Sequence, residues 1–277
     1  MATIEDRVAI EVDGQSLAAT LVTPGTLLPG VLFVHGWGGS QDQYLSRARE
    51  IAAQGCVCLT FNLRGHVETR PLFESVSREI NLRDLVAAYD LLAARRHVDP
   101  SAIAVVGSSY GGYLAAILTT LRPVKWLALR APALYIDTGW AMPKLQLHQS
   151  QDLKAYRMQP VKPGENKALA ACQAFEGDVL LIESQNDRVV PQAVLQSYRS
   201  ACTNARSLTY RCIAEADHGL TSEAGQRAYS TLLVNWLAEM LLGIRSSGDD
   251  EKRAAPAPAP ALPETPPQEL HAGAEQS

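Results

Sequence analysis

Residues Gly107–Gly111 form the pattern G-x-S-x-G, with Ser109 at its centre. An apolar, β-rich run, Ile103–Val106, precedes the pattern, and a helix-like run, Tyr113–Leu118, follows it. A strand that turns sharply into a helix lifts the central side chain above a sheet, and small neighbours relieve the crowding in this turn. The N-terminus of the helix also favours negative charge that develops beside it. The pattern therefore predicts a serine nucleophile at position 109, provided that partner residues exist elsewhere in the chain.

Such a serine needs a histidine, because a hydroxyl becomes a good nucleophile only when a neighbouring base takes its proton. His218 lies in a loop directly after the strand-like run Leu208–Ile213. Loops at the ends of strands carry the catalytic residues of open α/β sheets, so we predict that His218 is the base. Of the other histidines, we interpret His66 as structural, His97 and His271 as solvated, and His148 as a residue that could touch substrate.

The base in turn needs an acid that fixes its tautomer and stabilises its charged form. Asp187 lies in the loop Ser184–Pro191, which follows the buried, strand-like run Asp178–Glu183. We predict that Asp187 is this acid; the alternative is an aspartate that caps the following turn. Glu183 is a second candidate for the acid. Asp217 is adjacent to the base in sequence, so its carboxylate would have difficulty in reaching the far ring nitrogen.

A glycine-rich turn follows another predicted strand at Val31–Gly39. Glycines let backbone N–H groups point at a small anion without side chains in the way. We predict that the N–H groups of Trp37 and Tyr110 form an oxyanion hole. A nucleotide phosphate loop is the rival interpretation, but no lysine follows the glycines and the spacing G-x-G-x-x-G is missing.

Together these segments resemble the α/β-hydrolase superfamily, and they are most similar to the compact serine hydrolases of its dienelactone hydrolase and prolyl-oligopeptidase-like branch. The resemblance runs from about residue 8 to about residue 242 and rests on five segments: His35–Gly39, Asn62–His66, Gly107–Gly112, Asn186–Pro191 and Asp217–Gly219. It implies that Ser109 is the nucleophile, Asp187 the acid and His218 the base. Many relatives continue the loop that contains Arg-Gly-His, here Arg64–His66, with glycine and serine, whereas this chain has Val67–Thr69.

The resemblance implies a hydrolase that cleaves a small to medium carboxylic ester, or a thioester, through an acyl-enzyme and without metal or cofactor. An aminopeptidase-like amide hydrolase is the first alternative, because the same fold serves both reactions. Peptidase relatives usually add a large accessory domain or acidic residues that grip the amine, and the sequence shows no segment that would make such a domain. The second alternative is a binding protein that keeps the fold without turnover.

The composition is that of one large globular domain. The chain has 277 residues, of which 47% are hydrophobic and 19% charged. Its formal net charge of −4 comes from the end of the sequence: six acidic and two basic residues lie from Ser246 onward, which leaves 23 of each sign before that point. No basic face is indicated, so we expect no nucleic-acid partner.

The five cysteines form no C-x-x-C pair and no metal-ligand spacing, which favours a reducing compartment and no metal. The run Met1–Arg7 has neither a basic start nor a long apolar stretch, so we expect no secretory signal there. No stretch approaches about eighteen uninterrupted apolar residues, so we expect no membrane span. A cytoplasmic location follows as a prediction.

Hydrophobic periodicity predicts an α/β fold with a mostly parallel sheet and helices on both faces. Alternating residues predict an antiparallel hairpin within residues 8–21, which we expect to add strands at one edge of this sheet. The strands are predicted near 30–35, 56–61, 102–107, 125–130, 179–183 and 207–213. The helices are predicted near 42–54, 80–96, 111–121, 191–202 and 222–243.

Two segments depart from this alternation. Residues 133–175 are too long for a simple connection, so we predict a small lid inserted in the hydrolase domain of residues 1–245. Residues 246–277 are rich in proline and alanine and are predicted to be disordered, because they cannot bury enough apolar surface to offset the entropy of ordering. Such a tail could bind a partner domain; the simpler interpretation is a solubilising extension.

Overall fold

The computed structural model describes residues 3–12, 15–24 and 27–254 of the chain. It divides into two units, residues 1–241 and residues 242–277. The first unit contains every strand that the structure describes and all the predicted site residues.

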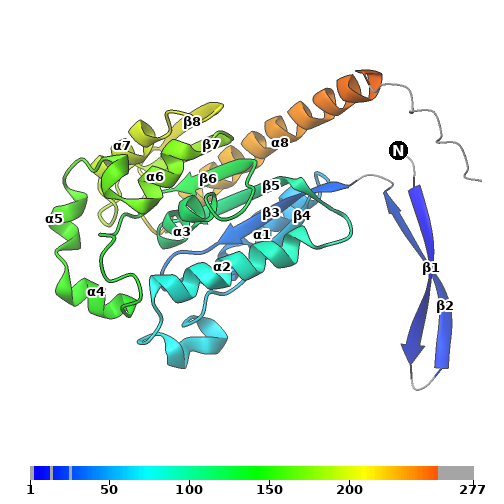
Figure 1. Cartoon of the computed structure of the whole chain (residues 1–277), viewed down its shortest axis with the longest axis horizontal. Helices are drawn as coiled ribbons and strands as arrows, with labels where there is room; N and C mark the ends of the chain where they lie inside the picture. Colours follow the sequence, from blue (N-terminus) through cyan, green and yellow to red (C-terminus); the bar gives the residue numbers. More distant parts are fainter. Residues whose placement is uncertain (1–2, 13–14, 25–26, 255–277) are drawn as a thin grey trace, which may run out of the picture. The chain divides into compact units, whose positions relative to one another are not determined.

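Six strands in the described part of the chain form a fully parallel sheet in the order β4-β3-β5-β6-β7-β8 (Figure 1). They are β3 (Leu28–Val34), β4 (Val57–Thr60), β5 (Val98–Ser108), β6 (Trp126–Arg130), β7 (Asp178–Ser184) and β8 (Ser207–Ile213). β4 pairs with one side of β3 and β5 with the other, so the strand order reverses at β3. Ligands of open parallel sheets bind outside the carboxyl ends of the strands at such a reversal. The parallel sheet that the sequence predicts is confirmed.

Two groups of helices cover the sheet. The principal helices are α1 (Asp42–Ala52), α2 (Arg78–Ala93), α3 (Tyr110–Leu118), α6 (Lys167–Ala174), α7 (Gln192–Ala201) and α8 (Glu223–Ala254). α2, α3, α6 and α7 contact one another in that order and form one layer. α1 and α8 contact each other where the Arg47 guanidinium lies 4.6 Å from the centre of the Tyr229 ring.

The middle of the sheet and helix α3 form the centre of the core. The run Ile103–Val106 in β5 is fully buried, and so is nearly every side chain of β6 and β7. Every residue of α3 is buried as well, which is why this helix is apolar on all sides instead of amphipathic. The strand and the helix that flank Ser109 are therefore held by packing on all sides.

The hairpin differs from the expectation in one respect. β1 (Thr3–Val12) and β2 (Gln15–Pro24) pair with each other antiparallel over ten residues each, as predicted. They form a two-stranded sheet of their own, and within the described residues neither strand pairs with the six-stranded sheet. The expectation that the hairpin extends the edge of the main sheet is therefore wrong, because the hairpin pairs its backbone groups internally.

The segment 133–175 contains four short helices: α4 (Lys144–Ser150), α5 (Leu153–Arg157), the 3₁₀ turn η2 (Pro163–Glu165) and α6. The buried Arg78 of α2 holds its start, donating to the carbonyl oxygens of Ile136 at 2.7 Å and Thr138 at 2.6 Å. α6 contacts both α3 and α7 and so belongs to the helical layer on the sheet. The stretch before α6 remains the candidate for a lid.

Helix α8 continues to Ala254, past Ser246, where the sequence places the start of the tail. The rest of the predicted tail, residues 255–277, lies outside the described residues. No helix in the described part of the chain combines the length and the apolar character that crossing a bilayer requires.

The turn from β5 into α3 passes very close to β3. A Cβ atom built on Gly111 would lie 2.3 Å from the carbonyl oxygen of Val34, and one built on Gly107 would lie 2.6 Å from that of Gly111. Both distances are far below van der Waals contact, and the opposing atoms belong to backbone that is fixed by the sheet and the helix. Only glycine fits at these two positions.

We expect Gly111→Ala to lower the free energy of unfolding by more than about 3 kcal/mol, the upper end of ordinary overpacking, because the clash is with backbone. Chemical denaturation would measure this change. Gly164→Ala is the matched control, since a Cβ there meets nothing within 4 Å. A Gly111→Ala protein as stable as the control would contradict the account of this turn.

Candidate active site

Ser109 stands at the junction of β5 and α3 with φ 53° and ψ −118°, a backbone conformation that residues other than glycine rarely adopt. Its N–H donates to the carbonyl oxygen of Arg130 at 2.9 Å, and its own carbonyl accepts from the N–H of Tyr113 at 3.1 Å. These bonds and the surrounding packing hold the strained backbone in place. The serine hydroxyl is thereby directed away from the sheet and the helix toward the loops above them.

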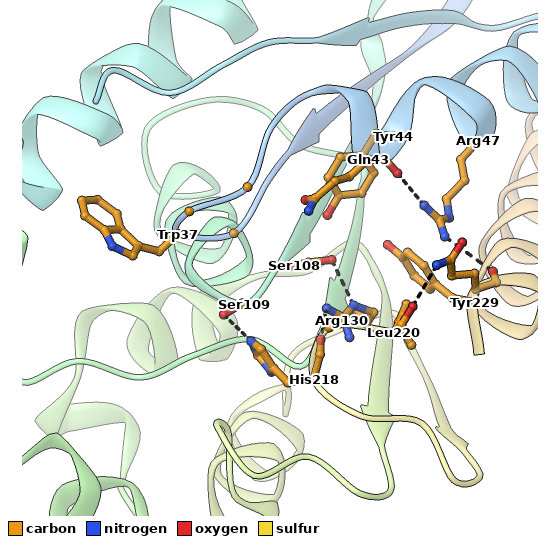
Figure 2. Close-up of a pocket in the computed structure, with 15 residues that line it drawn as sticks. Trp37, Gln43, Tyr44, Arg47, Ser108, Ser109, Arg130, His218, Leu220 and Tyr229 are labelled. Atoms are coloured by element: carbon orange, nitrogen blue, oxygen red, sulfur yellow. Dashed lines mark hydrogen bonds between the residues drawn. The ribbon is translucent and has the colours of Figure 1, made fainter. Parts of the chain in front are cut away.

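The structure brings Ser109, His218 and Asp187 together (Figure 2 shows the first two). The Oγ of Ser109 lies 3.0 Å from Nε2 of His218. Nδ1 of the same ring lies 2.6 Å from Oδ2 of Asp187. A carboxylate can only accept, so Nδ1 carries the ring proton and Nε2 presents its lone pair to the serine hydroxyl. This tautomer is the one in which the imidazole can take a proton from Ser109.

The Asp187 carboxylate is almost fully buried and stays ionised. Its side chain is 3% exposed. Burial raises its pKa, but hydrogen bonds from His218 and from the N–H groups of Val190 and Val189 outweigh burial, and the net pKa is below its usual value. Both N–H groups donate to Oδ1 at 2.8 Å, which leaves Oδ2 for the histidine. The acid is therefore both charged and fixed in orientation.

The two other acidic candidates are placed differently. The Asp217 carboxylate accepts from the N–H of Thr221 at 2.9 Å and from its hydroxyl at 2.7 Å, so it closes its own turn. Glu183 is buried, and burial together with the charge of Asp187 raises its pKa. Among the described residues, the ring of His218 hydrogen bonds to Asp187 and Ser109 and to neither of these two carboxyl groups.

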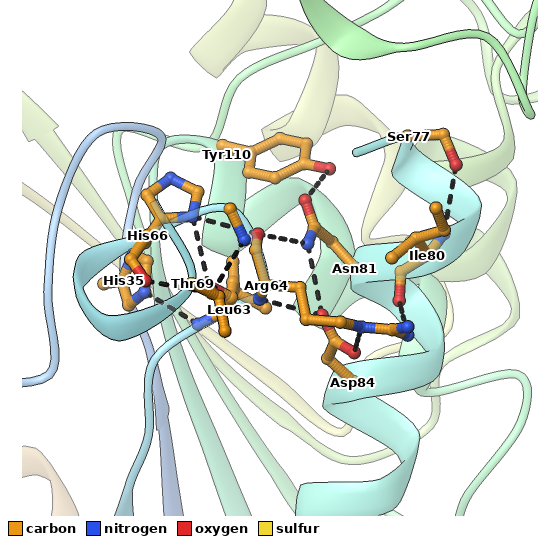
Figure 3. Close-up of polar contacts among 11 residues, drawn as sticks. His35, Leu63, Arg64, His66, Thr69, Ser77, Ile80, Asn81, Asp84 and Tyr110 are labelled. Carbon is orange, nitrogen blue, oxygen red and sulfur yellow. Dashed lines mark hydrogen bonds and ion pairs between the residues drawn. The ribbon is translucent and has the colours of Figure 1, made fainter. Parts of the chain in front are cut away.

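The glycine-rich loop after β3 lies directly beside the serine. A Cβ on Gly36 would be 3.3 Å from Cβ and 3.9 Å from Oγ of Ser109. His66 fixes this loop, because its Nε2 accepts from the N–H of Gly38 at 3.0 Å. Its Nδ1 faces the carbonyl oxygens of Leu63 and Arg64 at 3.2 Å (Figure 3). Burial lowers the pKa of His66, which keeps Nε2 free to accept. The structural interpretation of His66 agrees with these contacts.

The N–H of Tyr110 belongs to the first turn of α3, where backbone donors have no partner within the helix. The Tyr110 side chain is fully buried and its hydroxyl donates to Oδ1 of Asn81 at 3.1 Å, which ties this turn to α2 (Figure 3). Its ring also meets that of Trp37 edge-on, with centres 5.5 Å apart. The side chains of the two residues predicted as oxyanion donors are thus packed against each other.

Arg130, at the carboxyl end of β6, connects the ends of β5 and β7 with the loop of His218, and no motif in the sequence predicts this role. The side chain is 7% exposed. Nε donates to Oγ of Ser108 at 3.3 Å, Nη1 to Oγ of Ser184 at 3.2 Å, and Nη2 to the carbonyl oxygen of His218 at 2.8 Å. A charged residue at the end of an otherwise apolar strand was the available signal in the sequence.

A cavity of about 340 Å³ opens beside the serine (Figure 2). Its wall combines Ser109 and His218 with the glycine-rich loop and with side chains from α1 and α8. Besides those two residues, the lining consists of Gly36, Trp37, Gly38, Gly39, Gln43, Tyr44, Arg47, Ser108, Arg130, Gly219, Leu220, Gln226 and Tyr229. The contributions of α1 and α8 were not predicted, since each depends on where a distant helix crosses the sheet.

Asp187 makes a pH-dependent contribution to stability. Its pKa is lowered by folding, so the stabilisation is fully present above the unfolded value of about 3.9 and is lost as the pH falls through the lower folded value. We expect Asp187→Asn to reduce the free energy of unfolding at pH 7, and the difference from wild type to shrink below about pH 4. Urea titrations across this range would measure it; a difference that does not change with pH would contradict the assignment.

We expect Arg130→Met to loosen His218, because the carbonyl oxygen of His218 and two serine hydroxyls lose their donor together. The proton NMR signal of the Nδ1–H held between His218 and Asp187 should broaden or disappear. Arg49→Met, which changes an exposed arginine of α1, is the control and should leave that signal unchanged. A sharp, unshifted signal in Arg130→Met would show that Arg130 does not position the histidine.

Several solved structures share this fold. A dienelactone hydrolase from Anabaena variabilis ATCC 29413 is 19% identical, with a TM-score of 0.54 over 86% of this chain and 98% of that chain. A putative dienelactone hydrolase from Klebsiella pneumoniae subsp. pneumoniae MGH 78578 is 18% identical, with a TM-score of 0.58 over 86% of this chain and 99% of that chain. The thioesterase domain from the curacin biosynthetic pathway is 18% identical, with a TM-score of 0.53 over 84% and 99%. Comparison with curated protein sequences gives no match.

These similarities confirm the α/β-hydrolase fold, and a sequence match identifies the family. The profile of the Prolyl oligopeptidase family matches residues 43–243. This range covers most of the chain and includes Ser109, Asp187 and His218, while the glycine-rich loop lies just before it. The chain therefore belongs to the prolyl oligopeptidase family and is an enzyme, a hydrolase with the α/β-hydrolase fold.

Proposed function

We propose that this protein is a serine hydrolase that cleaves small to medium carboxylic esters, thioesters included, through an acyl-enzyme. One observation carries the proposal: the hydroxyl of Ser109 lies 3.0 Å from Nε2 of a histidine whose Nδ1–H is held at 2.6 Å by a buried carboxylate. This is the arrangement of nucleophile, base and acid that acyl transfer needs.

In the first half of the reaction, His218 takes the proton of Ser109 while Oγ attacks the carbonyl carbon of the ester. Asp187 stabilises the imidazolium that forms and keeps the ring in place. The negative charge that develops on the carbonyl oxygen would be accepted by the N–H groups of Trp37 and Tyr110. His218 then gives its proton to the leaving alcohol, and the acyl group stays on Ser109.

In the second half, a water molecule loses a proton to His218 and attacks the acyl carbon. The same two N–H groups receive the oxyanion again, and the acid leaves as the proton returns to Ser109. Removal of one such backbone donor typically costs on the order of 3–4 kcal/mol of transition-state stabilisation. The contacts of His66 with Gly38 and of Tyr110 with Asn81 support this role, because they fix the two loops that carry the donors.

The cavity limits the substrate. A volume of about 340 Å³ is at the lower end of small-molecule pockets, so it suits a short acyl chain and not a long lipid chain. The stretch of 133–165 is proposed as a lid over this region. Its helix α4 reaches the glycine-rich loop through the buried Lys144, whose Nζ lies 4.1 Å from the centre of the Trp37 ring. Burial lowers the pKa of Lys144 to about 7.

An aminopeptidase-like activity is the second candidate, and membership of the prolyl oligopeptidase family favours it. The cavity argues for an ester, because its lining within the described residues contains no aspartate or glutamate that could grip a substrate amine. Hydrolysis of matched p-nitrophenyl esters and amino-acyl anilides separates the two. Turnover of the anilides at rates equal to those of the esters would favour the peptidase.

We expect Ser109→Ala to lower ester turnover on the order of a millionfold, as loss of a triad nucleophile does in other serine hydrolases. Ser200→Ala, which changes an exposed serine on α7, is the matched control and should keep full activity. Labelling with a fluorophosphonate probe should modify wild type and Ser200→Ala but not Ser109→Ala. If Ser109→Ala kept a tenth of the wild-type activity, the assignment of Ser109 as the nucleophile would be wrong. If wild type were not labelled, a non-catalytic binding protein would become the better interpretation.

A further inference from the structure

Two arginines lie in the wall of the cavity that contains Ser109 and His218. Arg47 comes from α1 and Arg130 from the end of β6, and their side chains point to the same region (Figure 2). Arg47 is 9% exposed and Arg130 is 7% exposed. Two positive charges are therefore held in a largely desolvated place next to the nucleophile.

Neither arginine forms an ion pair with a carboxylate in the part of the chain that the structure describes. Nη1 of Arg47 donates to the carbonyl oxygen of Gln43 at 2.6 Å, and Nη2 reaches that of Gln226 at 3.5 Å. Nε of Arg47 is buried and has no hydrogen-bond partner among the described residues. Every hydrogen bond of Arg130 described above also goes to a neutral acceptor, a hydroxyl or a carbonyl.

Two tyrosines complete this wall. The Tyr229 ring lies 4.6 Å from the Arg47 guanidinium and 5.8 Å from that of Arg130, so its face is shared by both cations. Tyr44 is 3% exposed and belongs to the same lining. Burial and the neighbouring Tyr229 raise the pKa of Tyr44, which keeps its hydroxyl protonated and able to donate.

A buried cation is costly unless an opposite charge compensates it, and a guanidinium is most effective when it binds a planar carboxylate with two parallel hydrogen bonds. Within the described residues the lining of this cavity has no acidic side chain; Asp42, Glu50 and Glu223 share a different, neighbouring cavity with Arg47 and form no ion pair with it. A carboxylate of the substrate would therefore compensate the charge on the side of Arg47 that faces the nucleophile. Guanidinium N–H groups and tyrosine hydroxyls are all donors, which suits an acceptor-only anion.

We propose that this cavity selects esters that carry a carboxylate, with Arg47 as the main contact and Arg130, Tyr44 and Tyr229 supporting it. The inference rests on the proposed ester hydrolase activity and adds the charge of the substrate to it. Arg47 is the specificity-determining residue to test, because Arg130 also holds the backbone of His218 and its loss would disturb both functions.

Matched pairs of esters test the proposal. Mono-p-nitrophenyl glutarate and p-nitrophenyl valerate differ by a carboxylate in place of a methyl group at the end of the acyl chain. The pair 3-carboxyphenyl butyrate and phenyl butyrate places the carboxylate in the alcohol half. A hydrogen bond to a charged group changes an affinity by roughly 10- to 100-fold. We therefore expect kcat/KM to be higher by that factor for the charged member of at least one pair.

In Arg47→Gln this preference should fall at least tenfold, and Arg47→Lys should restore part of it. The preference is the ratio of kcat/KM for the charged ester to kcat/KM for its uncharged partner. Both values are measured on the same enzyme sample, so a lower fraction of folded protein does not change their ratio. Arg49→Gln, an exposed change on the same helix, is the control and should keep the wild-type ratio. A wild-type ratio near one for both pairs, or a ratio unchanged in Arg47→Gln, would overturn the inference while leaving the ester hydrolase in place.

A binding measurement separates the two proposals if no ester is hydrolysed. Glutarate should bind wild type at least tenfold more tightly than uncharged glutaramide in calorimetry, and Arg47→Gln should remove the difference. Tight glutarate binding without ester turnover would reject the proposed function and keep the anion site. Equal binding of the two compounds would reject the anion site whatever the turnover.

Discussion

The structure depends on the narrow passage where the chain leaves β5, turns at Ser109 and enters α3. The helix starts so close to β3 that the carbonyl of Val34 occupies the place where a side chain on Gly111 would be. This closeness forces the positive φ of Ser109, and packing of the fully buried α3 maintains it. The orientation of the hydroxyl is thus set by the core of the protein and not by the loops around it.

The parallel sheet supplies the rest of the geometry. The carboxyl ends of β5, β7 and β8 lie at one edge of a single sheet, with β6 between β5 and β7, so the loops that carry Ser109, Asp187 and His218 begin along the same edge. Arg130 then connects the ends of β5 and β7 with the loop of His218 through one side chain. The Arg130 guanidinium donates only to hydroxyl and carbonyl oxygens in these contacts. It therefore does not compete with His218 for the Asp187 carboxylate.

The sequence predicts those features that depend on local pattern. Alternation of strands and helices identifies the sheet, and the positions of Ser109, Asp187 and His218 after separate strands place them at one edge. Two features could not be predicted: that the hairpin forms a sheet of its own, and that α6 belongs to the helical layer. Each depends on which distant surface an element meets. The place of Arg47 in the cavity wall could not be predicted for the same reason: it depends on the approach of α8 to α1, which no short spacing in the sequence encodes.

The catalytic residues and the chain between β6 and α6 are held by different parts of the molecule. This has a consequence for how such a protein can diversify. The chain between β6 and α6 is attached at one end near Arg78 and at the other to the helical layer, whereas Ser109, Asp187 and His218 follow strands of the parallel sheet. Insertions or exchanges in that stretch would change what packs against Trp37, which Lys144 of this stretch contacts, without displacing the catalytic side chains. New selectivity could therefore arise in this segment by small steps, each compatible with a working catalyst.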